Sequence, residues 1–318
     1  MILTLTMNPS IDYLYSTQHF ELGHTNKMNN ATSSIGGKGI NAGRAAATMD
    51  STVILTGILC GSSGKIIKEK LYNENKFILD FIEKDEQNNR NAISIVHDSN
   101  THTEITEKGP IINETDKILI TNKIITILNN NDINIICISG SVNSNNDNFY
   151  SDIIESIQKK FPDLKIILDI SGKQLTNILN NKKIKIYMNK PNIHEFNEIN
   201  NFKCKNKNDV LNTIKNENLF NNIEISIISC GSEGAIVKHE NNIYDISIPK
   251  IEVVNPTGAG DSSIGGFASS IEKNNNIIAA IKYSMACGIS NTKNKEVGKI
   301  DKKDVENLSN EIKIKKIT

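Results

Sequence analysis

The sequence predicts an α/β protein with a doubly wound, mostly parallel central sheet. Short apolar runs rich in Ile and Val recur along the 318 residues, and amphipathic stretches of helical period separate them. Apolar runs without polar alternation are typical of strands that are buried on both faces, as in a parallel sheet covered by helices. Because crossovers between parallel strands are right-handed, few topologies besides the doubly wound one remain.

The predicted elements alternate from the N-terminus onward. Strands are expected at Ile2–Thr6, Val53–Thr56, Ile133–Ser139, Lys165–Asp169, Ile184–Met188 and Ile223–Ser229. Helices are expected at Lys65–Asn75, Glu114–Asn129, Asp147–Lys160 and Lys207–Asn218. The sequence has no Pro-rich or Gly-rich linker and no internal repeat, so we expect a single domain over residues 1–318.

Two polar segments, at about residues 12–33 and 90–106, interrupt this alternation. In the second segment Ile93 and Ile95 precede a polar turn, and Thr103 and Ile105 follow it, which is typical of a hairpin with one solvated face. Two such segments can form a small separate sheet. Because ligands of open α/β folds bind at the carboxyl ends of the strands, we expect this sheet to act as a lid over a site there.

The composition excludes several classes of protein. The 36 Lys and Arg residues balance 36 Asp and Glu residues, so the chain lacks the cationic field that drives binding to nucleic acid or an anionic membrane. The first residues do not resemble a signal peptide, and no run approaches the ~20 apolar residues of a membrane helix. Five Cys residues without a CxxC pair argue against a disulfide framework or a zinc site. We expect a cytoplasmic protein with no nucleic-acid or membrane partner.

The first concentration of glycine lies at residues 34–43 and leads into the helix-forming residues 44–47. Paired glycines, here Gly36 and Gly37, let a ligand approach the backbone, and the start of the following helix favours anionic or hydroxyl-rich groups. Asn41 is expected about one turn into that helix, where its amide can bond a sugar hydroxyl. The alternative interpretation is that these glycines form only a tight turn and bind no ligand.

The second concentration, at residues 255–267, is more informative. Gly258, Ala259 and Gly260 are small residues at an expected helix start, after a strand-like segment at Ile246–Val254, and their N–H groups can form an anion cradle. Asp261 follows directly, and an acid beside a bound phosphate is costly unless it accepts a proton from an attacking hydroxyl. An Asp in a first helical turn also fits the helix dipole alone. The Gly57–Lys65 segment looks like a phosphate-binding P-loop, but its spacing fails.

The two glycine clusters, in this order and separation, resemble the two signatures of the ribokinase-like (phosphofructokinase B) sugar kinase family. Further segments that resemble the family are Asn8–Asp12, Ile138–Ser141, Lys190–Glu195 and Ser229–Gly234. The resemblance covers essentially the whole chain. Within the family the chain is most similar to the branch of tagatose-6-phosphate kinases and 1-phosphofructokinases, and the Asn255-Pro256 pair favours the former.

The resemblance implies a role for each matching residue. Asp261 would be the general base, and the amides of Gly258, Ala259 and Gly260 would hold the charge of the transferred phosphoryl group. The residues that would hold the sugar are Asp12, Gly36, Gly37, Lys38, Asn41 and Ser139, while Arg90 and Lys27 from the lid would hold its phosphate. The residues that would bind ATP and Mg²⁺ are Lys190, Asn192, Glu195, Ser229 and Gly231, with Glu195 reaching the metal through water.

The implied activity is ATP-dependent phosphorylation of a ketohexose phosphate, with D-tagatose 6-phosphate converted to D-tagatose 1,6-bisphosphate. The alternative is a 1-phosphofructokinase that acts on fructose 1-phosphate. A kinase for ribose or a nucleoside is a further alternative, but it would need no basic group from the lid, so Lys27 and Arg90 argue against it. A non-catalytic regulator would need no general base, so Asp261 argues against that alternative. Exposed edges of the lid also suggest a homodimer that pairs there.

Overall fold

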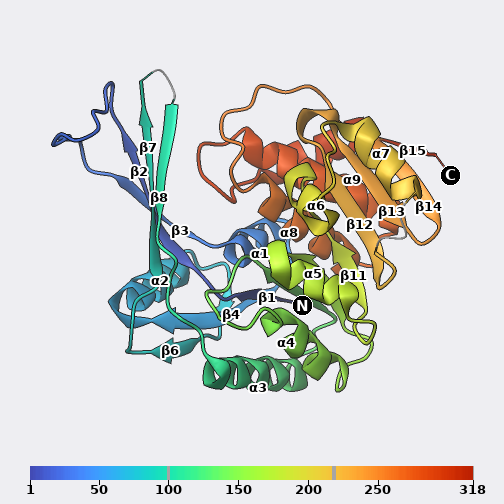
Figure 1. Ribbon diagram of the computed structural model, residues 1–318, viewed down its shortest axis with the longest axis horizontal. Helices are drawn as coiled ribbons and strands as arrows, with labels where there is room; N and C mark the ends of the chain where they lie inside the picture. Colours follow the sequence, from blue (N-terminus) through green and yellow to red (C-terminus); the bar gives the residue numbers. More distant parts are fainter. Residues whose placement is uncertain (99–100, 217–219, 318) are drawn as a thin grey trace.

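The chain forms two sheets in the computed structural model, which describes residues 1–98, 101–216 and 220–317 (Figure 1). Within these residues the larger sheet has eleven strands, with ten in the order β15-β14-β13-β12-β11-β10-β9-β1-β4-β5 and β6 paired to β4. Their bounds are β1 Ile2–Thr6, β4 Val53–Cys60, β5 Ile78–Leu79, β6 Ile82–Lys84, β9 Ile135–Ser139, β10 Lys165–Asp169, β11 Ile186–Asn189, β12 Ile223–Ser229, β13 Ala235–His239, β14 Asn242–Ser247 and β15 Lys313–Lys316.

The central strands of this sheet are parallel. β1 lies between β4 and β9, with Ile2 opposite Val53 on one side and Ile135 on the other, and parallel pairing continues from β9 to β12. Only β12 to β15, at one edge, pair in antiparallel fashion. The predicted fold class, a doubly wound and mostly parallel sheet, is therefore confirmed.

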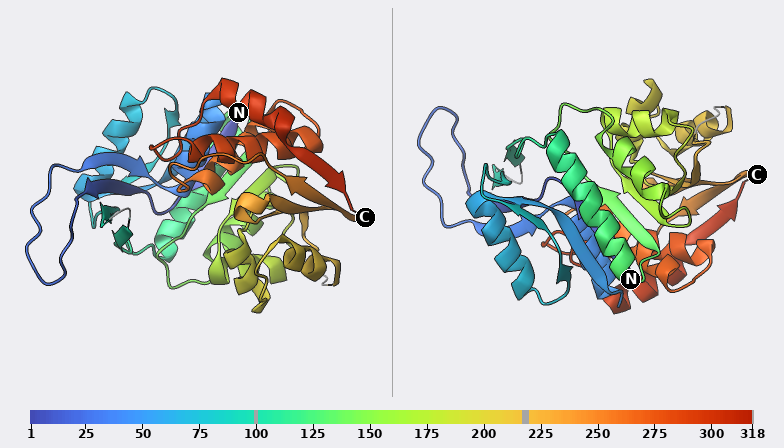
Figure 2. Two further views of the ribbon diagram at one scale, coloured as in Figure 1. Left: turned by 90° about the horizontal axis from the view of Figure 1, so that it is seen from above. Right: turned by 90° about the horizontal axis from the view of Figure 1, so that it is seen from below.

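Helices cover both faces of the sheet (Figures 1 and 2). Their bounds are α1 Lys38–Thr48, α2 Gly61–Asn73, α3 Glu114–Asn130, α4 Phe149–Gln158, α5 Gly172–Asn180, α6 Ile193–Asn200, α7 Lys207–Asn216, α8 Ala259–Glu272, α9 Ile277–Thr292 and α10 Lys302–Glu311. One apolar core packs α3 to α7 against one face, and a second packs α1, α2, α8, α9 and α10 against the other. Burial of each strand between two apolar layers explains why the strands are continuous apolar runs.

The smaller sheet has the order β3-β2-β7-β8 and stands away from the main body (Figure 1). Its strands are β2 Ser10–Ser16, β3 Thr32–Gly36, β7 Arg90–His97 and β8 Thr101–Thr106. In the β7–β8 hairpin Ile93 pairs with Ile105, as the alternating pattern predicts. The irregular segment between β2 and β3 projects from this sheet (Figure 2).

The boundaries of the elements follow local chemistry. The predicted strands at Ile2–Thr6, Lys165–Asp169 and Ile223–Ser229 agree with the structure. α3 begins after Asn113, whose side chain accepts from the Asp116 N–H while the Asp116 carboxylate accepts from the Asn113 N–H.

The expected strand at Ile246–Val254 is wrong, because β14 ends at Ser247 and the chain is irregular beyond it. Pro249 lacks the N–H that a continuing strand would need. The last two residues of the helix predicted at Lys207–Asn218 lie outside the described residues. All five Cys residues are buried and unpaired, and none of the described helices has the length and apolarity to cross a membrane.

Candidate active site

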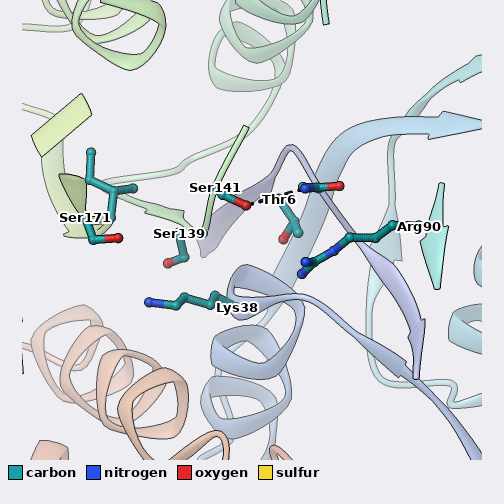
Figure 3. A pocket seen from close by; sticks show the side chains of 9 residues that line it. Thr6, Lys38, Arg90, Ser139, Ser141 and Ser171 are labelled. Atoms are coloured by element: carbon teal, nitrogen blue, oxygen red, sulfur yellow. Dashed lines mark hydrogen bonds between the residues drawn. The ribbon is translucent and has the colours of Figure 1, made fainter. Parts of the chain in front are cut away.

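A pocket of about 140 Å³ lies at the carboxyl ends of β1, β9 and β10 (Figure 3). The first residues of α1 and β7 close its sides with two cations, Lys38 and Arg90. The pocket is lined by Thr6, Asn8, Lys38, Arg90, Ser139, Gly140, Ser141, Ile170 and Ser171. The site therefore lies where a parallel α/β sheet places its ligands.

Several polar atoms of this pocket have no partner within the protein. Thr6 Oγ1, Asn8 Oδ1, Ser139 Oγ and Arg90 Nε are all buried and make no hydrogen bond. Buried polar groups are nearly always hydrogen-bonded, so unpaired ones that face a cavity indicate a ligand or water there. Hydroxyls, an amide and a guanidinium together suit a ligand that carries both hydroxyl groups and an anion.

Asp12 and Arg90 lie beside each other in the smaller sheet. Burial raises the pKa of Asp12, while a hydrogen bond from Ser10 Oγ at 2.6 Å and the charge of Arg90 oppose the rise. Burial lowers the pKa of Arg90 and the charge of Asp12 opposes that change, so the guanidinium stays cationic. A Cβ at Gly36 would lie 2.0 Å from Asp12 Oδ2, so only glycine in β3 leaves room for this carboxylate.

Asp261 lies in the first turn of α8 and is buried. The helix starts after Gly258, whose φ of 80° belongs to the left-handed region that glycine enters without strain. Burial, and then the nearby Asp169 carboxylate, raise the pKa of Asp261 to about 7. A hydrogen bond from Asn41 Nδ2 and the charges of Lys38 and Lys190 oppose this rise. A carboxylate with a pKa near neutrality is suited to act as a general base.

Two lysines surround this carboxylate. Lys38 Nζ lies 3.4 Å from both Asp169 Oδ1 and Glu195 Oε1, and it also lines the pocket. Burial alone would lower the pKa of Lys38, but Asp169, Glu195 and Asp261 raise it overall. Lys190 is buried, which lowers its pKa, and its Nζ would lie 3.6 Å from a Cβ on Gly260. The structure thus places both ammonium groups near Asp261, and that of Lys190 beside Gly260.

The segment predicted to bind ATP lies at the carboxyl end of β11 and β12. Asn192 is the N-cap of α6, and its Oδ1 accepts from the Glu195 N–H, while Glu195 Oε2 accepts from the Asn192 N–H. The Ser229 N–H donates to the carbonyl of Pro191, which brings the end of β12 beside this cap. Gly231 follows with a φ of 58° and open space at its Cβ position.

Two of the residues predicted to bind the sugar phosphate, Lys27 and Asn41, do not line the pocket. Lys27 is exposed in the segment between β2 and β3 and is not among the residues lining the pocket. Asn41 is buried, and its amide bonds the protein on both sides, to Asp261 and to Arg44, so neither end of the amide is open to a sugar.

Sequence reasoning missed several residues of the site. Thr6, Asn8 and Ser171 line the pocket, and Asp169 lies beside Lys38. Asn8 and Asp169 stand at or just after the ends of predicted strands, and that position is the signal that could have identified them. Among the described residues, no group of three or more His, Cys, Asp and Glu side chains could hold a metal ion.

Asn291, near the end of α9, was also missed. It is fully buried, its Nδ2 donates to the Thr257 carbonyl at 2.7 Å, and its Oδ1 accepts from the Gly298 N–H at 2.7 Å and from Ser262 Oγ at 3.2 Å. The side chain therefore holds together the loop before Gly258, the first turn of α8 and the loop after α9.

Comparisons with known proteins agree with this geometry. Residues 5–302 match the model of the pfkB family of carbohydrate kinases. A tagatose-6-phosphate kinase of Staphylococcus epidermidis is 33% identical over 315 residues, which cover 99% of each chain. A possible 1-phosphofructokinase from Thermotoga maritima has a similar structure, with a TM-score of 0.86 at 21% identity over 100% of this chain and 99% of that one. Phosphofructokinase-2 from Escherichia coli has a TM-score of 0.85 at 22% identity, over 97% of this chain and 98% of that one. The chain therefore belongs to the pfkB family of carbohydrate kinases and is an ATP-dependent sugar kinase of ribokinase-like fold.

Proposed function

We propose that this kinase phosphorylates D-tagatose 6-phosphate at C1 to give D-tagatose 1,6-bisphosphate. The observation that carries the proposal is the pocket in which the unpaired Arg90 Nε meets the unpaired hydroxyls of Thr6 and Ser139. A guanidinium that is buried without a full set of partners is suited to bind a phosphate. The likeness to the Staphylococcus epidermidis tagatose-6-phosphate kinase supports this choice of sugar.

The sugar lies between the smaller sheet and the start of α1 in this proposal. Asp12, the backbone of Gly36 and Gly37, Lys38 and Ser139 bond its hydroxyls, and Arg90 binds its 6-phosphate. Lys27 joins the phosphate only if the segment between β2 and β3 closes over the pocket. We propose that the smaller sheet is the lid, at about residues 12–33 and 90–106, and that its closure excludes the water that would otherwise hydrolyse ATP.

ATP lies on the other side of Asp261, along Lys190, Asn192, Ser229 and Gly231. Glu195 would hold Mg²⁺ through water, and the metal would neutralise phosphate charge when bound with ATP. Both Glu195 oxygens already bond the protein, one to the Asn192 N–H and one to Lys38, which fits a contact through water better than direct ligation.

Transfer then needs one proton acceptor and one anion site. Asp261 accepts the proton of the C1 hydroxyl, the hydroxyl oxygen bonds the γ-phosphorus, and the bond from phosphorus to ADP breaks. The N–H groups of Gly258, Ala259 and Gly260 and the ammonium of Lys190 stabilise the charge that spreads over the phosphoryl oxygens.

An ATP-coupled assay over three sugars tests the substrate. We expect tagatose 6-phosphate to give a kcat/KM at least ~10-fold above those of fructose 6-phosphate and fructose 1-phosphate, since each stereocentre or phosphate position changes several hydrogen bonds. A preference for fructose 1-phosphate would instead assign the protein as a 1-phosphofructokinase. Binding of sugar phosphate without ADP formation would assign a non-catalytic regulator.

We also propose that two subunits pair through the lid. β8 is an edge strand, and Leu14 in β2 and Ile105 in β8 are 45% and 56% exposed. Exposed strand edges with apolar side chains favour pairing with a second chain.

A further inference from the structure

The amide of Asn41 links the general base to a charged side chain. Asn41 lies in α1 and is 4% exposed. Its Nδ2 donates to Asp261 Oδ2 at 2.8 Å, and Arg44 Nη1 donates to its Oδ1 at 2.8 Å. The amide therefore bridges the carboxylate of α8 and the guanidinium one turn further along α1.

The two neighbours determine which way this amide faces. A guanidinium can only donate hydrogen bonds, and an ionised carboxylate can only accept them. The amide oxygen must therefore face Arg44 and the amide nitrogen must face Asp261. An amide turned by 180° would place its oxygen against the carboxylate and its N–H₂ group against the guanidinium, and both contacts would be repulsive.

Arg44 is itself fixed on three sides. Its Nε donates to Glu74 Oε2 at 2.9 Å and its Nη2 to Glu74 Oε1 at 2.7 Å, while Nη1 also donates to the carbonyl of Ile35 at 2.8 Å. Glu74 directly follows α2, and Ile35 precedes Gly36 in β3. Arg44 is 12% exposed and does not line the pocket. This paired, fork-shaped contact leaves the guanidinium little freedom.

We propose that Arg44 is a positioning residue for phosphoryl transfer. It fixes the Asn41 amide so that Nδ2 holds one oxygen of Asp261 and leaves the second oxygen for the substrate hydroxyl. The inference rests on the proposed role of Asp261 as the base. Arg44 itself touches neither the sugar nor ATP.

The surroundings of Asp261 explain why a fixed donor is needed. Asp169 from β10 repels its charge, while the charges of Lys38 and Lys190 oppose that repulsion. The Asn41 N–H stabilises the ionised form, which is the form that accepts a proton. If Arg44 is lost, the amide is free to turn, Asp261 loses this donor, and its ionised form becomes less stable.

The test is the pH dependence of kcat in Arg44→Met and Arg44→Lys. We expect each variant to lower kcat by about 10- to 100-fold and to move the acid limb up by about 0.5–1 pH unit, with KM for ATP unchanged. Arg44→Lys keeps the charge but cannot form the fork, so it should behave like Arg44→Met. Glu74→Gln weakens the hydrogen bonds to the Arg44 guanidinium and leaves Arg44 charged. It should move the acid limb of the pH profile in the same direction, but by less.

Lys207→Met is the matched control for general loss of stability. Lys207 forms a half-buried ion pair with Asp245 at 2.7 Å, on α7 and β14 at the antiparallel edge of the main sheet. We expect it to lower the melting temperature as Arg44→Met does and to leave the acid limb in place. An unchanged limb in Arg44→Met, or full wild-type kcat in Arg44→Lys, would overturn the proposal.

A second readout needs no turnover. In protein carrying ¹³C-labelled Asp carboxyls, the Asp261 resonance, assigned by its absence in Asp261→Asn, should titrate at higher pH in Arg44→Met than in wild type. The same midpoint in both would refute the role of Arg44. If the midpoint moves but the wild type phosphorylates no sugar phosphate, the positioning network stands and the proposed function fails.

Discussion

At the scale of single residues, the account depends on a carboxylate held among charges of both signs. Asp261 is buried, the Asp169 carboxylate repels its charge, and the ammonium groups of Lys38 and Lys190 attract it. A buried carboxylate of this kind lowers the stability of the folded state, and groups with such a shifted pKa cluster at functional sites. Its raised pKa therefore has consequences for both stability and rate.

The first prediction concerns stability. Because the folded-state pKa of Asp261 lies at about 7, above its ordinary value of 3.8, the folded protein binds this proton more tightly than the unfolded chain. The stability that this provides is complete below about pH 4 and is lost as the pH rises through 7. We expect Asp261→Asn to be more stable than wild type at pH 8 by roughly 1–3 kcal/mol, with a difference that shrinks towards pH 4. Urea unfolding at a series of pH values measures this; equal stability at pH 8 would show that Asp261 carries no burial cost.

The second prediction concerns Arg90. Removing its guanidinium in Arg90→Met should raise KM for the sugar phosphate about 10- to 100-fold, because a charge-assisted hydrogen bond to phosphate contributes about 1.5–3 kcal/mol. KM for ATP should not change, since Arg90 lies on the sugar side of Lys38. Steady-state kinetics with each substrate varied in turn provide the measurement. A selective rise in KM for ATP would place the two ligands in the opposite order.

At this scale the sequence predicted the types of residue better than their partners. Asp261 and Gly258 lie at the start of α8, where the sequence predicts a helix start, and Arg90 lies in the smaller sheet at the pocket. Asn41 was expected to bond the sugar, but its contact with Asp261 joins residues 220 positions apart and needs α1 and α8 packed together. A single sequence does not contain that information.

At the scale of elements, close packing of α1 against α8 builds the site. A Cβ at Gly265 would lie 2.1 Å from the carbonyl of Ala42, so glycine lets the two helices approach. This approach brings Asn41 to Asp261. Asn291 then joins α9 to the loop before α8, which fixes the cradle from the other side.

The third prediction tests this connection. Asn291→Ala leaves the Thr257 carbonyl and the Gly298 N–H without a partner, so we expect a loss of about 2–4 kcal/mol of stability and a raised KM for ATP. Asn310→Ala is the control, since Asn310 is an exposed residue of α10 whose side chain bonds one carbonyl, and it should change stability by less than ~0.5 kcal/mol. Thermal melting and ATP titrations provide the comparison. A KM for ATP that stays at the wild-type value in Asn291→Ala would exclude a role in shaping the cradle.

The apolar strands and long helices of the central sheet were predictable because their patterns are local. Lys165–Asp169 and Glu114–Asn130 are examples, the first a continuous apolar run and the second a capped helix. The antiparallel edge of β13 to β15 was not predicted. Its short strands mix polar and apolar residues, and β15 comes from the far end of the chain.

At the scale of the whole molecule, the chain is neutral overall, yet three cations gather at the site. Lys38, Lys190 and Arg90 come from three separate parts of the sequence and meet at the carboxyl ends of the strands. Net charge argues against binding to nucleic acid, but it does not locate this cluster, which exists only in the folded chain.

The fourth prediction concerns assembly. If the lid pairs two subunits, light scattering should give twice the mass of one chain. Ile105→Glu should shift the protein towards the monomer, because a charge on an exposed edge strand opposes pairing. Ile118→Glu, at an equally exposed position on α3, is the control and should leave the mass unchanged. A wild-type mass of one chain, or a dimer unaffected by Ile105→Glu, would place any interface elsewhere.

The most direct test of the central claim is the product formed by wild type and Asp261→Asn from ATP and tagatose 6-phosphate, followed by ³¹P NMR. The account predicts a new phosphomonoester signal at C1 beside the retained 6-phosphate, and a rate reduced roughly 10²- to 10⁴-fold in Asp261→Asn. ADP formation without a second phosphate on the sugar, or a variant that forms the bisphosphate at the wild-type rate, would contradict it.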